Sequence, residues 1–266
     1  SGDFRECIWY KRKDIFLLVF MFMFGTNILH AQRNMERLGR GTVAVRSNSS
    51  QVMVGWRILG LEFNAGVRYN LYRGATLIAS NLNVSNFIDN TPSNSTYQVA
   101  AVVNGVEQLK SPAVSVNTYV HGSNTMACIR VPIRVNGGYS PNYLHVGDLD
   151  GDGEYDFVFT KLSSSRHWIE AYKRDGTFLW RLDAGPNSAN QDNIEPGSST
   201  FDMGHGDNWT VYDLNSDGKA EVIVRVANGV IFGDGTTFTN SNNSRQFMAV
   251  LDGMTGAPLA TIGMPT

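Results

Sequence analysis

The first half of the chain follows the polar and apolar pattern of short β-strands. Runs rich in Val, Ile, Leu and Tyr are separated by clusters of Gly, Asn, Ser and Pro, which is typical of strands joined by turns. No stretch keeps the period of an amphipathic helix. Strands are expected at 42–45, 52–56, 69–72, 77–78, 86–89, 97–103 and 114–116. About seven short strands in a stretch of this length predict a β-sandwich over residues 33–118.

Two aromatic residues fit the core of such a sandwich. Trp56 ends the second strand and is expected to be buried, and Tyr97 stands where a tyrosine corner falls. The pair Asn104 and Gly105 predicts a tight hairpin. The order of these features resembles a fibronectin type III module, which implies binding, spacing or bracing, and we assign it no chemistry.

A connection follows the sandwich over residues 119–137. Residues 119–128 are mostly small or polar, which predicts a linker. The apolar run 129–135 is interrupted by Pro132, so we expect an edge strand there, because proline cannot donate a hydrogen bond to a neighbouring strand.

The second half repeats a longer unit of apolar strands. In each copy an acidic loop is followed by a strand, a polar stretch, an aromatic or apolar strand and a turn that contains Gly. Strands are expected at 157–159, 168–172, 178–181, 222–224, 247–251 and 258–260. Four-stranded units of this kind are typical of propeller blades, so residues 138–266 are expected to form about two blades. A propeller closes with about four to eight blades, and we therefore expect the sequence to lack its C-terminal part.

The two acidic loops, 148–156 and 213–221, have the spacing of cation ligands. Oxygen-bearing side chains occupy loop positions 1, 3, 5 and 9, with Gly at position 6 for the sharp turn. Ca²⁺ takes roughly six to eight oxygen ligands, and position 7 would add the backbone carbonyl of Glu154. Lys219 holds that position in the second loop. The predicted Ca²⁺ ligands are Asp148, Asp150, Asp152, Glu154, Asp156, Asp213, Asn215, Asp217, Lys219 and Glu221.

The alternative is two acidic surface turns without a metal. Two copies in matching context favour Ca²⁺, because carboxylates placed this close together would otherwise repel one another. The loops are not EF-hands, because they lack the position-12 Glu and a strand rather than a helix follows.

The N-terminal residues 1–31 read as a leader with a signal peptide. Lys11, Arg12 and Lys13 precede an apolar run at 15–24 that is too short to span a bilayer, and cleavage after Ala31 is plausible. We expect a secreted protein (extracellular, periplasmic or at the cell surface) without stable membrane insertion after cleavage. An uncleaved anchor is the alternative.

Composition gives information on the classes of partner and on disulfide bonds. The chain has 266 residues, 42% of them apolar, and a net charge of -2, which suits one or two globular domains and gives no argument for nucleic acid. Of the two cysteines, Cys7 lies in the leader and Cys128 is left alone, so a disulfide framework is excluded. We expect a monomer.

Several segments, read together, carry a resemblance to a known family. They are 35–41, 52–59, 69–73, 147–155 and 211–222. In order and spacing, residues 33–266 resemble the start of a family 11 polysaccharide lyase, a rhamnogalacturonan lyase. The resemblance implies an all-β chain with a fibronectin III-like β-domain followed by the first blades of an eight-bladed, calcium-rich propeller. It also implies β-elimination in rhamnogalacturonan I, the rhamnose–galacturonate backbone of pectin, with this pectic polysaccharide as the partner.

Two departures from the family pattern indicate a divergent branch. Residues 160–163 stand where a Lys-Trp-Asp run follows the first loop, and residues 225–229 replace a Lys-Thr-Ala-Asp-Gly run after the second. Most of the family's cleft would lie in blades beyond this sequence.

β-Elimination beside a uronate needs a neutralised carboxylate, a base and a proton for the leaving oxygen. In the stretch 204–209, His205 is a candidate base, and Asp207 could orient it or bind metal. Asp207 and Trp209 are also substrate-binding candidates, since Trp209 could stack on a sugar. Arg225 is a second catalytic candidate and Asn228 a further substrate-binding one. The alternative is that His205 caps a turn, Trp209 packs in a blade and Arg225 pairs with an acid. Weaker candidates are Lys161, Arg166 and His167, which we expect in a solvated polar loop.

The sequence is also compatible with a second, non-catalytic function. The acidic loops belong to the structural repeat, so the chain could be a non-catalytic, calcium-braced propeller for carbohydrate binding or adhesion, as in integrin heads.

Overall fold

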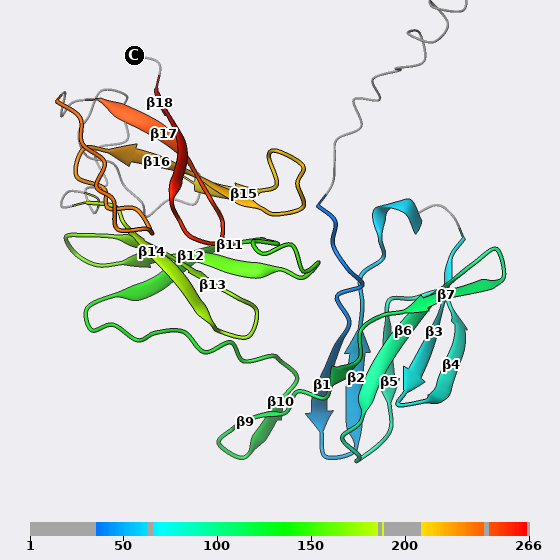
Figure 1. The fold of residues 1–266 in the computed structure, drawn as a ribbon. Helices are drawn as coiled ribbons and strands as arrows, with labels where there is room; N and C mark the ends of the chain where they lie inside the picture. Colours follow the sequence, from blue (N-terminus) through cyan, green and yellow to red (C-terminus); the bar gives the residue numbers. More distant parts are fainter. Residues whose placement is uncertain (1–35, 63–65, 186–187, 189–208, 242–244, 265–266) are drawn as a thin grey trace, which may run out of the picture. The chain divides into compact units, whose positions relative to one another are not determined.

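The computed structural model describes residues 36–62, 66–185, 188, 209–241 and 245–264 (Figure 1). These residues form eighteen β-strands and one short 3-10 turn, Gly60–Glu62, and no α-helix. The expected all-β class is confirmed. No helix in this described part is long and apolar enough to cross a membrane. The leader expected over residues 1–31 lies outside the described residues.

The first half of the described chain forms two antiparallel sheets. The smaller sheet has the order β1-β2-β5, with β1 (Val43–Asn48), β2 (Gln51–Gly55) and β5 (Asn86–Asp89). The larger sheet has the order β4-β3-β6-β7, with β4 (Thr76–Leu82), β3 (Arg68–Arg73), β6 (Thr96–Val103) and β7 (Val106–Lys110), and β8 (Val114–Ser115) pairs with β6. All expected strands of this region are present, with ends that differ by a few residues.

One hydrophobic cluster joins these two sheets, because alternate residues of their strands point to the same side. Val52 and Val54 of β2 and Leu71 of β3 are fully buried in it. Trp56 is buried as expected, with its ring edge-on to Tyr69 at a centroid distance of 5.7 Å. Large rings and branched aliphatic side chains supply most of the apolar area that stabilises such a core.

The structure tests two predictions for this region, a tyrosine corner at Tyr97 and a hairpin at Asn104 and Gly105. Tyr97 is fully buried, and its hydroxyl donates to the carboxylate of Asp89 at 2.6 Å. A tyrosine corner would instead bond to the backbone. Asn104 and Gly105 join β6 to β7 with φ angles of 50° and 79°, which are the left-handed values of a type I′ turn, so the hairpin is confirmed.

The connection between the two halves differs from the expectation. Residues 119–126 form a hairpin of β9 (Tyr119–His121) and β10 (Asn124–Met126) instead of a plain linker. The expected edge strand over 129–135 does not form. The backbone at Arg134 bonds to side chains instead of a strand: its N–H donates to the hydroxyl of Tyr172 at 3.0 Å, and its carbonyl accepts from the ammonium of Lys161.

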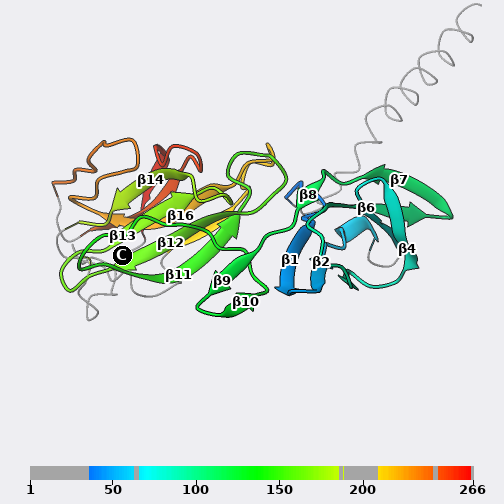
Figure 2. The same cartoon turned by 90° about the horizontal axis from the view of Figure 1, so that it is seen from below.

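The second half of the described chain contains two four-stranded antiparallel meanders, whose strands are labelled in Figure 1. Figure 2 shows the strands of the first one, β11 to β14, from below. The first has the order β11 (Ser140–Gly147), β12 (Asp156–Leu162), β13 (Trp168–Tyr172) and β14 (Phe178–Asp183). The second has the order β15 (Trp209–Tyr212), β16 (Glu221–Ala227), β17 (Gln246–Leu251) and β18 (Pro258–Gly263). All six strands expected here are present, and β11 and β15 begin the two sheets.

A single hydrophobic cluster spans both four-stranded sheets. Ile169 and Leu182 of the first sheet and Val224 and Leu251 of the second are fully buried in it. The approach is close at Gly253, where a Cβ would lie 2.0 Å from the carbonyl oxygen of Ala220, so only glycine fits. The shared core holds the two acidic loops, which join β11 to β12 and β15 to β16, in fixed positions.

Candidate metal centre

The first acidic loop gathers three carboxylates. Asp148, Asp150 and Asp156 each offer an oxygen, and these oxygens lie within 4.8 Å of one another. Asp148 directly follows β11 and Asp156 begins β12, so the two strands hold the ends of the loop. Three converging carboxylates are the donor set that a hard cation such as Ca²⁺ prefers.

The backbone of the loop folds around Asp148. One carboxylate oxygen of Asp148 accepts from the N–H groups of Gly151 at 2.8 Å and Asp152 at 3.1 Å. The other oxygen accepts from the N–H of Gly153 at 2.8 Å. Gly151 and Gly153 have φ angles of 80° and 87°, which other residues rarely adopt. The glycines of the motif therefore allow the turn that brings the acids together.

Burial makes it costly to keep the carboxylates of this loop charged. Asp148 and Asp156 are each only 2% exposed. Burial raises the pKa of Asp156 to about 6, and the charges of Asp150 and Asp152 add to the effect. Burial also raises the pKa of Asp148. A bound cation would offset this cost, and the only ion pair that the described residues make with the three acids is that of Lys173 with Asp150.

The second loop places its two end carboxylates in the same way. Asp213 and Glu221 are 6% and 5% exposed. One oxygen of Asp213 accepts from the N–H of Gly218 at 3.0 Å, and Glu221 accepts from the N–H of Leu214 at 2.8 Å. The other oxygen of Asp213, Oδ1, is buried without a hydrogen-bond partner among the described residues. Burying a carboxylate oxygen without a partner costs free energy, so Oδ1 of Asp213 is well suited to bind a cation.

The remaining predicted ligands are not gathered as the first three are. Asp152, Asn215, Asp217 and Lys219 have exposed side chains. The carboxylate of Glu154 points to two arginines, Arg57 at 3.1 Å and Arg174, which leaves only its backbone carbonyl for a metal. The sequence pattern gave no sign of these arginine contacts.

The candidate cleft residues are only partly described. His205 and Asp207 lie outside the described residues. Trp209 is 3% exposed, with its ring 4.2 Å from that of His145, which favours the alternative that it packs in the core. Arg225 on β16 donates to the side chain of Gln246.

The structure does bring two of these candidates to one place. Trp209 and Arg225 both line a pocket of ≈ 340 Å³, together with Thr210, Ile223, Val224, Met248 and Met264. Asn228 is not among the lining residues, and its side-chain oxygen accepts from the N–H of Asn240 at 2.9 Å.

Lys161 corrects a prediction. It was expected in a solvated loop, but it lies on β12 and is 1% exposed. Its ammonium pairs with the fully buried carboxylate of Glu170 on β13 at 2.7 Å. Burial opposes the charge on Glu170, but hydrogen bonds from Lys161, Tyr172 and Arg181 outweigh it and lower the pKa of Glu170. One weak signal of this pair can be seen in the sequence, where the charged Glu170 stands between the apolar Ile169 and Ala171.

The other two weak candidates have structural partners. The side chain of Arg166 pairs with Asp183 at 2.7 Å. His167 is 4% exposed, and its ring nitrogen accepts from the N–H of Ser163 at 3.2 Å.

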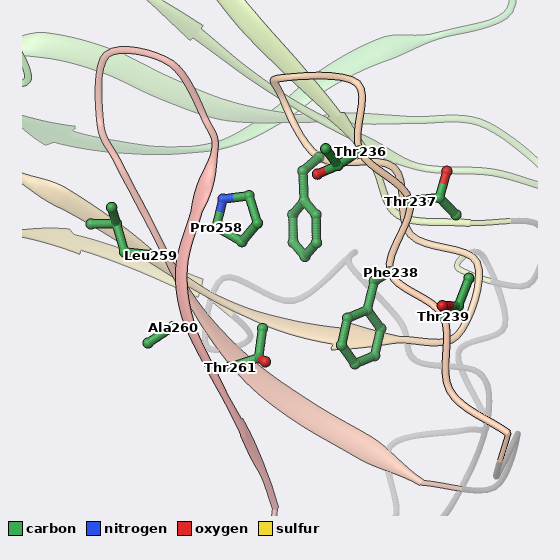
Figure 3. A pocket seen from close by; sticks show the side chains of 9 residues that line it. Thr236, Thr237, Phe238, Thr239, Pro258, Leu259, Ala260 and Thr261 are labelled. Carbon is green, nitrogen blue, oxygen red and sulfur yellow. The ribbon is translucent and has the colours of Figure 1, made fainter.

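A larger pocket offers no acid–base chemistry. It measures ≈ 500 Å³ and lies between β18 and the segment before β17 (Figure 3). Its lining residues are Phe232, Thr236, Thr237, Phe238, Thr239, Pro258, Leu259, Ala260 and Thr261. None of these side chains titrates near neutral pH.

Family models match both halves of this fold. Residues 33–117 match the rhamnogalacturonan I lyase beta-sheet domain. Residues 132–264 match the C-terminal domain of rhamnogalacturonan lyase family 11. The class of protein that these matches define is a polysaccharide lyase, and the chain belongs to family 11 of the rhamnogalacturonan lyases.

Two curated relatives from Bacillus subtilis (strain 168) agree with this assignment. The rhamnogalacturonan endolyase YesW is 35% identical, with 97% of this chain and 45% of YesW covered. The rhamnogalacturonan exolyase YesX is 33% identical, with 87% of this chain and 40% of YesX covered. The crystal structure of YesW superposes with a TM-score of 0.67 at 32% identity, covering 88% of this chain and 42% of YesW. The chain thus spans less than half the length of these relatives.

Proposed function

We propose that this chain acts in the cleavage of the rhamnogalacturonan I backbone of pectin by calcium-assisted β-elimination. The observation that carries the proposal is the pair of family matches, which together cover residues 33–117 and 132–264. The activity of the relatives is known for chains more than twice as long, so the proposal concerns the protein to which these residues contribute.

The proposed domain boundaries are based on how the strands group into sheets. Residues 33–118 are a fibronectin III-like sandwich, 119–137 a connection, and 138–266 about two blades of an eight-bladed propeller. Two sheets with one shared core support the first assignment, and two four-stranded meanders with a second shared core support the other. We further propose a leader with a signal peptide over 1–31, secretion of a monomer, and no stable membrane insertion or nucleic-acid partner.

The proposed cofactor is Ca²⁺, bound by the two acidic loops. Asp148, Asp150 and Asp156 would hold it in the first loop, and Asp213 and Glu221 in the second. The loops contact each other through the N–H of Ala220, which donates to the carbonyl of Asp148 at 2.7 Å. A cation in either loop would therefore brace the junction between the two four-stranded sheets.

The chemistry divides between charge neutralisation and proton transfer. Neutralising the uronate carboxylate makes the C5 proton more acidic, and a guanidinium could do this, as could a cation if one were bound. Among the described residues we propose Arg225 for this contact, because it lines the pocket beside Trp209. His205 remains the candidate base, Asp207 its orienting partner, and Asn228 a further sugar contact. The base takes the C5 proton, the C4–O4 bond breaks as O4 is protonated, and the C4=C5 double bond that forms makes an unsaturated uronate.

The test is ultraviolet absorbance of that conjugated product. Residues 33–264 replace the matching part of YesW, and this hybrid is assayed on rhamnogalacturonan I beside intact YesW and beside this chain alone. We expect a rise with the hybrid on rhamnogalacturonan I and none on homogalacturonan. A hybrid that folds and binds the glycan without turnover would contradict the proposal and favour a calcium-braced binding module.

A further inference from the structure

The segment just before β1 lies against the first acidic loop. The N–H of Gly39 donates to the carbonyl of Gly153 at 2.7 Å. The approach is so close that a Cβ on Gly153 would lie 2.9 Å from the backbone nitrogen of Gly39. Gly153 holds position 6 of the loop, so the segment touches the loop at its sharpest turn.

Arg57 fastens this contact from the end of β2. Its guanidinium donates to the carbonyls of Gly39 at 3.2 Å and Gly153 at 3.0 Å. A third hydrogen bond reaches the carboxylate of Glu154 at 3.1 Å. The guanidinium carbon also lies 4.6 Å from the centre of the Tyr155 ring. One planar cation with several donors thus holds loop positions 6 to 8 and the segment before β1.

Arg57 is in turn anchored to the core of the first two sheets. Its N–H donates to the carbonyl of Arg40 at 2.7 Å, and Arg40 donates back to the carbonyl of Arg57 at 3.0 Å. Arg40 pairs with Glu62 at 2.6 Å, and the hydroxyl of Tyr69 donates to Glu62 at 3.1 Å. Tyr69 is 2% exposed in the first hydrophobic cluster. A continuous set of contacts therefore leads from that core to the acidic loop.

We propose that Arg57 and Gly39 form a clamp that couples cation binding in the first loop to the docking of residues 36–40. The clamp holds the carbonyl of Gly153 and the carboxylate of Glu154, and a cation would use the backbone carbonyl of Glu154, the next peptide group along the loop. Because coupling between two binding events is reciprocal, the cation strengthens the clamp by the factor by which the clamp strengthens cation binding. The inference rests on the proposed Ca²⁺ site.

The competing explanation is that Arg57 only neutralises Glu154. Arg174 makes an ion pair with the same carboxylate oxygen but comes from the turn between β13 and β14. Among the described residues, no hydrogen bond joins Arg174 to residues 36–40. Arg174→Met is therefore the matched control for Arg57→Met.

Trypsin provides the first readout, because Arg37 is exposed in the segment that the clamp holds. We expect Ca²⁺ to slow cleavage after Arg37 in the unchanged chain. Arg57→Met should abolish this protection and weaken Ca²⁺ binding about tenfold, measured by calorimetric titration. Arg174→Met should keep the protection. Equal loss in both variants would overturn the clamp.

A second pair of variants tests the glycine contact. Gly151 and Gly153 both have left-handed φ angles, so alanine strains the loop at either position. Only Gly153 faces the segment; a Cβ on Gly151 would meet the side chain of Lys219 at 3.2 Å. We expect Gly153→Ala to lose calcium-dependent protection at Arg37, and Gly151→Ala to retain it at saturating Ca²⁺.

The outcomes separate this inference from the metal proposal. If Ca²⁺ raises the melting temperature but leaves cleavage after Arg37 unchanged, the clamp is wrong and the metal site stands. If Ca²⁺ changes neither property, both are wrong.

Discussion

Asp156 is a buried carboxylate of the candidate metal centre whose charge depends on pH. It is 2% exposed, and burial raises its pKa to about 6. Cation ligands must be deprotonated, so protons compete with Ca²⁺ for this carboxylate. Neutral pH favours the cation, and mildly acidic pH favours the proton.

We predict that Ca²⁺ binding weakens as the pH falls from 7 to 5. Calorimetric titrations at several pH values check this, with Asp156→Asn as the variant that loses the dependence. In chelator the effect of pH on stability has the opposite sign, because the pKa of Asp156 in the folded state lies above its ordinary value of 3.8. Stability from protonated Asp156 is then fully present below about 3.8 and is lost as the pH rises through about 6. Equal Ca²⁺ affinity at pH 5 and 7 would contradict the prediction.

Asp150 gives a second prediction at this scale. Asp150→Ala removes one of the three gathered oxygens, so the melting temperature in Ca²⁺ should fall and chelator should have less effect. The control is Asp234→Ala, since Asp234 is an exposed turn residue that accepts from Thr236. An unchanged melting temperature and chelator response in Asp150→Ala would reject the metal assignment for this loop.

At the scale of elements, β12 and β13 are joined by a buried ion pair as well as by their backbone. Lys161 reaches across to Glu170 and also donates to the carbonyl of Arg134 and to Asn136. These contacts replace the strand that was expected over 129–135. Removing one partner of a buried pair leaves the other charge uncompensated.

We predict that Lys161→Met lowers the free energy of unfolding by about 3 kcal/mol. Arg181 still pairs with Glu170, so the loss should lie at the low end for a buried pair. Adding Glu170→Gln should recover part of the loss, because the unpaired charge is gone. Urea unfolding measures both, and a loss below about 0.5 kcal/mol would show that the pair contributes little.

Elements that are determined by residues close together in the sequence could be predicted, and contacts between distant residues could not. The strand over 168–172, the hairpin at Asn104 and the acids of the first loop were predicted, because local pattern and spacing define them. The contact of Arg57 with Glu154 joins positions 97 residues apart, which no local pattern can show. The burial of Lys161 was missed for a related reason, since only the partner on the next strand makes a buried lysine tolerable.

At the scale of the whole molecule, the described chain contains two hydrophobic clusters. One belongs to the first two sheets and the other to the two four-stranded sheets. The acidic loops lie beside the second cluster, where fully buried Leu149 follows Asp148. Family membership and this arrangement are the two observations behind the proposed calcium-braced scaffold.

The most direct test of this conclusion is the initial rate of ultraviolet absorbance increase on rhamnogalacturonan I. It is measured for the hybrid of residues 33–264 with YesW, in Ca²⁺ and again after chelation. We expect a rate in Ca²⁺ that chelator removes and that added Ca²⁺ restores. A folded hybrid that produces no unsaturated uronate in Ca²⁺ would contradict the proposed function.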